Sequence, residues 1–232
     1  MNELFQGSLF FGVFISVFAY WIGMLIRKKF NHPLLNPMLI AVVLVIGFLL
    51  VTGTSYEAYN QSAKYLSYLI TPTTVSLAIP LYRRLNVLKK NPTAIILSLA
   101  SGVISSLLSV YLLCLLFGCN YEIFATLMPK SITTAIGIDL STELGGNASL
   151  TAVAICITGL TGTIFADSIL KLFKITHPVA MGLAIGCSAH ALGTTHAIEL
   201  GEIQGAMSSL AIVISGLLTV VLAPIVAALP IA

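Results

Sequence analysis

The chain has 232 residues, of which 58% are hydrophobic and only 8% are Asp, Glu, Lys or Arg. Because an average soluble domain carries roughly 25% of these charged residues, the composition excludes a soluble enzyme and predicts a single membrane domain over 1–232. The net charge of +3 comes from scattered residues with no basic face, so we expect no nucleic-acid partner.

Six apolar segments are candidate transmembrane helices, which predicts an all-α polytopic membrane protein in a lipid bilayer. A helix needs about 20 residues to cross roughly 30 Å of hydrocarbon, so the second segment is short. Pro72 interrupts the third segment, either as a break that lines a functional cavity or as a simple proline kink. The segments lie at 5–26, 37–52, about 66–82, 93–118, 148–170 and 205–229.

Most of the basic residues gather in the first and third loops between these spans. The positive-inside rule places both loops in the cytoplasm of a bacterial cell. We therefore predict a multi-pass inner-membrane protein whose N-terminus and C-terminus both lie outside. The residues are Arg27, Lys28, Lys29, Arg83, Arg84, Lys89 and Lys90.

Two further segments, 122–146 and 176–200, are apolar enough to enter the membrane but carry ionisable residues. If each is a re-entrant hairpin, its arms of about 10 residues reach roughly 15 Å, the middle of the bilayer. Lys171 and Lys174 then lie inside, as the positive-inside rule requires. If both segments cross fully, these two lysines lie outside. We predict six spans plus two re-entrant or broken helical segments.

The two polar segments resemble each other. Ala135-Ile136-Gly137 and Glu143-Leu144-Gly145 recur 56 residues later as Ala191-Leu192-Gly193 and Glu199-Leu200-Gly201. This offset pairs 122–170 with 176–229 as two units of inverted topology, the layout of secondary transporters. Small apolar residues are common in membrane proteins, so chance is the alternative explanation.

A packing signal lies in the second polar segment. Gly182 and Gly186 are one helical turn apart and permit a close contact with a neighbouring helix.

Each polar segment also contains a stretch that is predicted to break its helix, with Pro129 and Gly137 marking the break in the first. Irregular backbone at membrane depth persists only where protein or water satisfies its polar groups. Because the two stretches offer hydroxyls, backbone N–H groups and the positive ends of half-helices, we expect them to bind a small anion. The predicted substrate-binding residues are Lys130, Ser131, Thr133, Thr134, Ser188, His190, Gly193, Thr194 and Thr195.

The Lys130 side chain has two possible roles. It adds a full positive charge to the anion site, or its side chain reaches the headgroups or pairs with Glu143.

Five ionisable residues are candidates for coupling transport to a proton or to Na⁺. Imidazole titrates near physiological pH, and ionisable groups within a membrane segment mark functional sites. The alternatives are histidines that are hydrogen-bonded within the helix packing and glutamates that cap helix ends. The candidates are His190, His196, Glu143, Glu199 and Asp139.

Metal binding and catalysis have no support in the sequence. No His, Cys, Asp and Glu spacing supplies a set of metal ligands. No nucleophile–base arrangement, P-loop or dinucleotide fingerprint is present. We expect no metal, no cofactor and no enzymatic activity.

Four motifs carry a family resemblance over almost the whole chain. They are Pro33-Leu34-Leu35-Asn36-Pro37, the segment 72–82, Met128-Pro129-Lys130-Ser131-Ile132-Thr133-Thr134 and Ser188-Ala189-His190-Ala191-Leu192-Gly193-Thr194. With these motifs the chain resembles the CidB/LrgB family, which includes a plastid glycolate/glycerate translocator. Ala135 stands where the family typically has proline, and Thr195-His196-Ala197 replaces an arginine-bearing stretch, so the substrate does not transfer directly.

The resemblance implies two rival functions. One is transport of small carboxylates of the pyruvate, glycolate, glycerate or lactate class. The other is holin- or antiholin-like regulation of murein hydrolase activity, programmed cell death and lysis. The resemblance also implies a small membrane partner of the CidA/LrgA type. Because carriers often need a static scaffold to move against, we expect a homodimer, and of the two functions we favour transport by alternating access.

Overall fold

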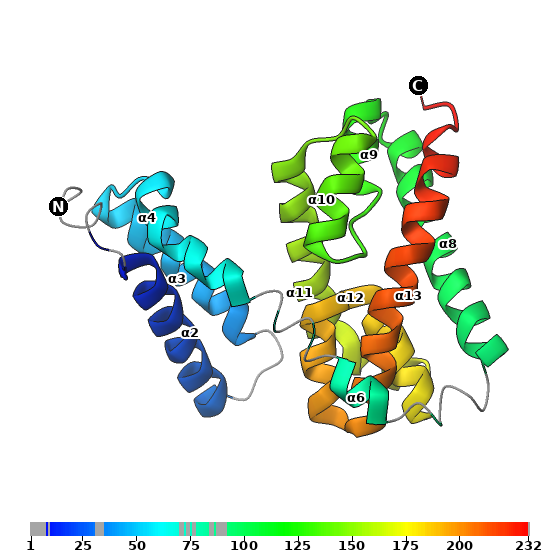
Figure 1. Ribbon diagram of the computed structural model, residues 1–232, viewed down its shortest axis with the longest axis horizontal. Helices are drawn as coiled ribbons and strands as arrows, with labels where there is room; N and C mark the ends of the chain where they lie inside the picture. Colours follow the sequence, from blue (N-terminus) through cyan, green and yellow to red (C-terminus); the bar gives the residue numbers. More distant parts are fainter. Residues whose placement is uncertain are drawn as a thin grey trace. The chain divides into compact units, whose positions relative to one another are not determined.

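The computed structural model describes residues 8, 10–30, 35–69, 72, 75, 78–83, 86 and 92–231. The chain divides into two compact units, Met1–Ser76 and Leu77–Ala232. All regular secondary structure in the described residues is helical, which confirms the predicted all-α class (Figure 1).

The first unit contains α2 (Phe11–Phe30), α3 (Pro37–Thr52), α4 (Tyr56–Ala63) and the 3-10 helix η1 (Lys64–Leu69). The second predicted span coincides with α3, because Asn36 caps its start, with Pro37 as first residue, and Gly53 ends it in the left-handed conformation. The Gly12 N–H donates to the Ser62 hydroxyl at 2.7 Å, which fixes α2 on α4.

The predicted third span is not one described helix. Its described parts are the end of η1 and the short α6 (Ala78–Arg83), which belongs to the second unit. Pro72 is exposed, while Thr73 and Thr74, the rest of the predicted interruption, lie outside the described residues.

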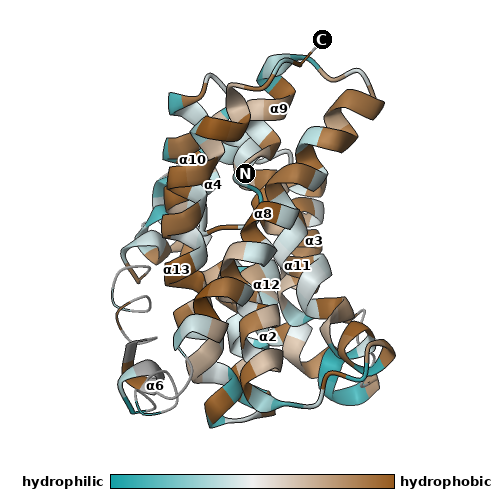
Figure 2. Cartoon of the chain, turned by 90° about the vertical axis from the view of Figure 1, so that its right-hand side faces the viewer, coloured by the Kyte–Doolittle hydropathy of each residue, from teal (hydrophilic) through white to brown (hydrophobic). Residues whose placement is uncertain are grey.

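The second unit contains the functional segments. It comprises α6, α8 (Pro92–Leu116), α9 (Tyr121–Leu127), α10 (Thr134–Glu143), α11 (Ala148–Leu172), α12 (Pro178–Leu200) and α13 (Glu202–Ala227). Among the described residues, α2, α8, α11 and α13 are long and apolar enough to cross a membrane, and α3 is a shorter apolar helix. Hydrophobic residues dominate these helices in Figure 2.

The first polar segment folds as a helical hairpin of α9 and α10, called hairpin 1. Its arms approach closely at the open end: a Cβ atom added at Gly146 would lie 2.7 Å from the Thr126 backbone nitrogen. The break occupies the residues between Leu127 and Thr134 and includes Pro129, as predicted. Gly137 does not mark the break. It lies inside α10, because the extended conformation of Thr133 already starts that helix.

Buried hydroxyls hold the open end of hairpin 1 to α11. The Thr151 hydroxyl oxygen lies 2.6 Å from Ser141 Oγ and 3.1 Å from the Thr126 carbonyl oxygen. The Asn147 N–H donates to Thr126 Oγ1 at 2.8 Å. These contacts join both arms of the hairpin to the start of α11, and satisfy polar groups that would be costly to bury alone.

The second polar segment, α12, also folds back on itself and is called hairpin 2. A Cβ at Gly193 would lie 3.0 Å from the Ile185 carbonyl oxygen, whereas eight residues of straight helix span about 12 Å. The reversal occurs at His190, whose φ of 41° and ψ of −127° are non-helical. Ile185 and Ala197, on the two arms, therefore share one buried cluster.

The two hairpins enter the second unit from opposite ends (Figure 1). Their tips meet, because Lys130 and Ser131 of hairpin 1 and Ser188 of hairpin 2 line one cavity, and the backbone of Lys130 lies close to the His190 ring. This is the opposed arrangement that re-entrant segments of inverted topology require. Each hairpin is followed by a long helix, α11 or α13. The internal repeat of 122–170 and 176–229 stays a prediction.

Hairpin 2 packs on α13 through glycines. A Cβ at Gly182 would lie 2.8 Å from Met207 Cβ, and one at Gly186 would lie 2.7 Å from Ser208 Cα. The close helix contact predicted for these two glycines is confirmed, and it joins hairpin 2 and α13 at backbone distance.

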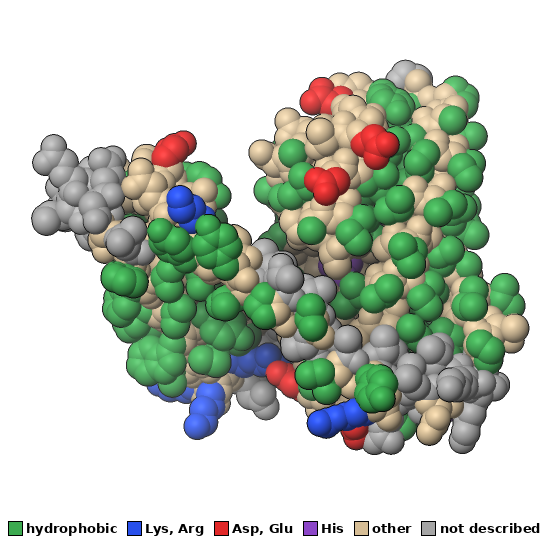
Figure 3. All heavy atoms as spheres, viewed as in Figure 1, with side chains coloured by type: hydrophobic (Ala, Val, Ile, Leu, Met, Phe, Trp, Pro, Cys, Tyr) green, Lys and Arg blue, Asp and Glu red, His purple; other side chains and the backbone are tan. Residues whose placement is uncertain are grey.

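The two ends of the second unit differ in charge. Lys171 and Lys174 lie at the end of α11, where α12 begins, and Arg83 ends α6 at the same level (Figure 1). The opposite end carries Glu122 and Glu143 and, among the described residues, neither lysine nor arginine. The first end also carries Asp167, Glu199 and Glu202, so the two ends differ in their lysine and arginine residues. We call the first the basic end and the second the acidic end. Figure 3 shows the hydrophobic flank between them.

Candidate functional site

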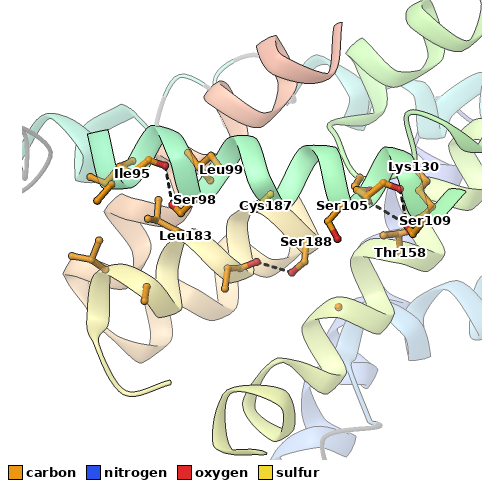
Figure 4. Close-up of a pocket in the computed structure, with 18 of the residues that line it drawn as sticks. Ile95, Ser98, Leu99, Ser105, Ser109, Lys130, Thr158, Leu183, Cys187 and Ser188 are labelled. Carbon is orange, nitrogen blue, oxygen red and sulfur yellow. Dashed lines mark hydrogen bonds between the residues drawn. The ribbon is translucent and has the colours of Figure 1, made fainter. Parts of the chain in front are cut away.

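A partly open cavity of about 800 Å³ lies in the second unit, between α8, α11 and the first arm of hairpin 2. The tip of hairpin 1 reaches its wall with Lys130 and Ser131. Figure 4 shows Lys130 near Ser109 of α8, with Thr158 of α11 beside them. Of the predicted binding residues, the structure brings Lys130, Ser131 and Ser188 to this cavity.

Apart from His177, Lys130 is the only basic residue among the described residues that line the cavity. Its Nζ donates to Ser131 Oγ at 3.3 Å. No acidic side chain of the described ranges forms an ion pair with it, so the predicted alternative of a bridge to Glu143 is absent there. A half-buried ammonium without a carboxylate partner favours an anion as the missing partner.

The structure adds a row of serines on α8 that sequence reasoning missed. These residues, called the serine face, are Ser98, Ser105, Ser106 and Ser109. Ser106 donates to Ser131 Oγ at 3.0 Å, so the serine face also supports the tip of hairpin 1. The spacing of these serines could have indicated the face, because residues seven, eight and eleven positions after Ser98 lie on the same side of a helix. The rest of this span has the apolar composition of a lipid-facing helix.

His190 lies beside this cavity rather than on its wall. It is 4% exposed, and its Nε2 has no hydrogen-bond partner among the described residues. A Cβ at Gly159 of α11 would lie 3.5 Å from the His190 ring. The ring therefore sits in a tight space between the tip of hairpin 1 and α11, where it links the two tips.

The remaining predicted binding residues lie away from the cavity. Thr194 is buried and its hydroxyl bonds the His190 carbonyl at 2.8 Å and the Ser208 hydroxyl at 2.7 Å. Gly193 is buried between the arms of hairpin 2. Thr133 is half-buried, Thr134 is exposed, and Thr195 is exposed with its hydroxyl on the Leu192 carbonyl. These residues shape the hairpins and do not line the cavity.

The coupling candidates fall into two places. His196 Nε2 lies 2.9 Å from Asp167 of α11, and His196 Nδ1 lies 3.7 Å from Glu199. This cluster is at the basic end, where hairpin 2 returns. Asp139 and Glu143 are exposed on α10. Among the described residues no group of three His, Cys, Asp or Glu side chains is arranged to hold a metal ion.

The backbone at His190 yields a testable contrast. Its φ of 41° with ψ of −127° belongs to a region that glycine alone enters readily. Both His190→Ala and His190→Gly remove the imidazole, but only glycine relieves a backbone strain of about 1–3 kcal/mol. In detergent, we expect His190→Gly to melt above His190→Ala, as measured by thermal denaturation. An alanine variant at least as stable as the glycine variant would show that the turn is unstrained.

Comparison with known proteins gives a consistent family. The family model described as the LrgB-like family matches residues 16–229. The chain is 36% identical over 225 residues to "Holin-like protein CidB" of Staphylococcus epidermidis, covering 97% of each chain. It is 36% identical over 216 residues to "Antiholin-like protein LrgB" of Bacillus mycoides, covering 93% of this chain and 94% of the relative.

A third relative, "Antiholin-like protein LrgB" of Bacillus subtilis, is 36% identical over 219 residues, covering 94% of this chain and 95% of the relative. No solved structure matches the chain significantly. The predicted resemblance is confirmed: this multi-pass membrane protein belongs to the LrgB-like family, whose members carry both holin-like and antiholin-like names.

Proposed function

We propose that the protein is a secondary carrier of small carboxylates in the bacterial inner membrane and works by alternating access. The observation that supports this most is the meeting of two opposed hairpin tips at a cavity whose wall holds Lys130. Discontinuous helices that meet at the middle of the bilayer are the substrate sites of many secondary transporters. The ammonium of Lys130 binds the carboxylate, and cavity hydroxyls bind the hydroxyl or keto oxygen.

The coupling step belongs to the same proposal. A proton or Na⁺ drives the carrier, and the cluster of His196, Asp167 and Glu199 is the candidate proton site because it brings an imidazole and two carboxylates together. A homodimer supplies the static scaffold, and a small membrane partner of the CidA/LrgA type assembles with it. Both termini lie outside and the basic end faces the cytoplasm, following the positive-inside rule.

A second candidate is a holin- or antiholin-like role in murein hydrolase control, cell death and lysis. The names of the three relatives favour it. These names describe an effect on the cell, whereas the geometry bears on a molecular activity. Flux of a small acid through a carrier changes the proton balance across the membrane, so the two candidates are compatible.

Proteoliposomes distinguish a carrier from a pore. Vesicles containing the purified protein are preloaded with unlabelled pyruvate, glycolate or lactate and given the radiolabelled acid outside, with a small anionic dye trapped inside. We expect saturable uptake of at least one acid and retention of the dye, with protein-free vesicles as the control. Dye release without saturable uptake would favour a pore and contradict the carrier.

A further inference from the structure

The cavity reaches only one end of the second unit. On α8 its lining residues run from Ala94, near the start of the helix, to Ser109, and none lies in the last turns up to Leu116. On hairpin 2 they run from His177 to Ser188 and belong to the first arm alone. Both sets begin at the basic end and stop near Lys130, before the acidic end.

An apolar cluster lies beside the inner part of this cavity on α8 and continues beyond it towards the acidic end. It packs hairpin 1 against the second half of α8 and the end of α13, and we call it the apolar seal. Its side chains are nearly all buried, which leaves no space for a hydrated ion. Its members are Val103, Leu107, Val110, Cys114, Phe124, Met128, Ile132, Leu140, Ala223 and Ala227.

The serine face runs along the open half. Ser98 lies towards the basic end, and Ser105 and Ser109 lie deeper, towards Lys130 (Figure 4). Ser98, Ser105 and Ser109 are exposed to the cavity. The Ser98 and Ser109 hydroxyls donate to carbonyl oxygens of their own helix, and they must rotate to donate to an anion that loses part of its water on entering apolar surroundings. Lys130 places positive charge at the inner end.

We propose that the serine face of α8 is the wall of a one-sided access path, along which a small anion reaches Lys130 from the basic end while the apolar seal closes the acidic end. The structure is accordingly the state of the carrier that is open at its basic end. This inference rests on the proposed carrier function for its biological meaning, but the path itself is testable without any flux.

Two native cysteines can report which side of the membrane the cavity opens to. Cys187 lines the cavity and lies against Gly102 of α8, where a Cβ would be 2.8 Å from its Sγ. Cys119 follows α8 at the acidic end and is half-buried. In wild-type protein, right-side-out and inside-out vesicles receive an anionic, membrane-impermeant methanethiosulfonate reagent, and mass spectrometry measures modification at each cysteine. A Lys174→Cys variant marks the basic end.

We expect Cys187 to react from the same side as Lys174→Cys, at least about tenfold faster than from the opposite side, since the seal excludes a charged reagent. Cys119 should react from the opposite side or not at all. Modification of Cys187 from the side opposite to Lys174→Cys, or from neither side, would overturn the proposal. Wild-type protein needs no substitution for the Cys187 measurement, so misfolding cannot obscure it.

Two variants test the wall and the charge. Ser98→Leu, on the serine face, should slow Cys187 modification by at least about fivefold because leucine fills the passage. The control Ser101→Leu, off that face, should leave the rate unchanged; equal rates in both would refute the wall. Lys130→Gln should lower the ratio of anionic to cationic reagent rates by roughly fivefold, while Glu122→Gln, at the acidic end of the same unit, should not. An unchanged ratio in Lys130→Gln would remove Lys130 from the path.

These outcomes are independent of transport. If vesicles show no saturable uptake but Cys187 behaves as expected, the carrier function fails and the access path stands. If uptake is saturable but Cys187 is unreactive from the basic end, the path fails and the carrier function stands.

Discussion

Lys130→Gln lowers the initial rate of carboxylate uptake into proteoliposomes by roughly 10- to 100-fold, the loss expected when a charged hydrogen bond of about 1.5–3 kcal/mol is removed. Lys130 forms no ion pair with a described acidic residue, and its Nζ lies on Ser131 at the cavity wall. Glutamine keeps a polar, slightly shorter side chain but removes its charge. The measured quantity is the initial rate of radiolabelled acid uptake at equal protein content.

The control is Lys171→Gln, which removes the same charge from an exposed position at the end of α11. It should transport at the wild-type rate within about twofold, the margin of a surface charge worth a few tenths of a kcal/mol. Lys130→Arg keeps the charge but changes its geometry, so it should retain more uptake than Lys130→Gln. Wild-type uptake in Lys130→Gln would exclude this lysine from the binding site.

Gly186→Ala destabilises the second unit by about 2–3 kcal/mol, because overpacking against backbone cannot be relieved by a side-chain rotation. The added Cβ would meet the Ser208 carbonyl oxygen and lie 2.8 Å from Ala211 Cβ. Both neighbours belong to α13, so the whole hairpin would have to move. Thermal denaturation in detergent, followed by circular dichroism, should show the loss as a lower midpoint.

Gly216→Ala is the matched control within the same unit. Gly216 is also a buried helical glycine, but its Cβ would lie 3.4 Å from Ile136 Cδ1 and near no other atom. Alanine is the better helix former by about 1 kcal/mol, so this variant should melt at or slightly above the wild-type temperature. Equal midpoints for both variants would show that hairpin 2 and α13 are not held at backbone distance.

Much of the second unit could be predicted because its signals are local. The predicted spans at 93–118, 148–170 and 205–229 match α8, α11 and α13 to within three residues at each boundary. Both polar segments were predicted to be re-entrant or broken, and both reverse in the structure, with Pro129 in the break of the first. Gly137 did not, because glycine is compatible with a helix when, as here, close packing against Ile155 requires it.

The composition of the site was harder to predict. Sequence spacing placed Lys130, Ser131 and Ser188 near one another, but it could not separate cavity residues from those that hold the hairpins. The Thr194 hydroxyl is already hydrogen-bonded to the His190 carbonyl and the Ser208 hydroxyl. Such partners depend on which helices become neighbours. The serine face was overlooked for the same reason, since a hydroxyl in an apolar span can equally bond its own backbone.

The buried hydroxyls around Thr151 have a mechanical consequence. They fasten both arms of hairpin 1 to α11 at the acidic end, whereas its tip contacts its neighbours mainly through the apolar seal and Ser106. Hydrogen bonds are directional, whereas apolar contacts are not. We therefore expect a movement of hairpin 1 to pivot at Thr151, which would displace Lys130, at the far end of the arm, by the largest distance.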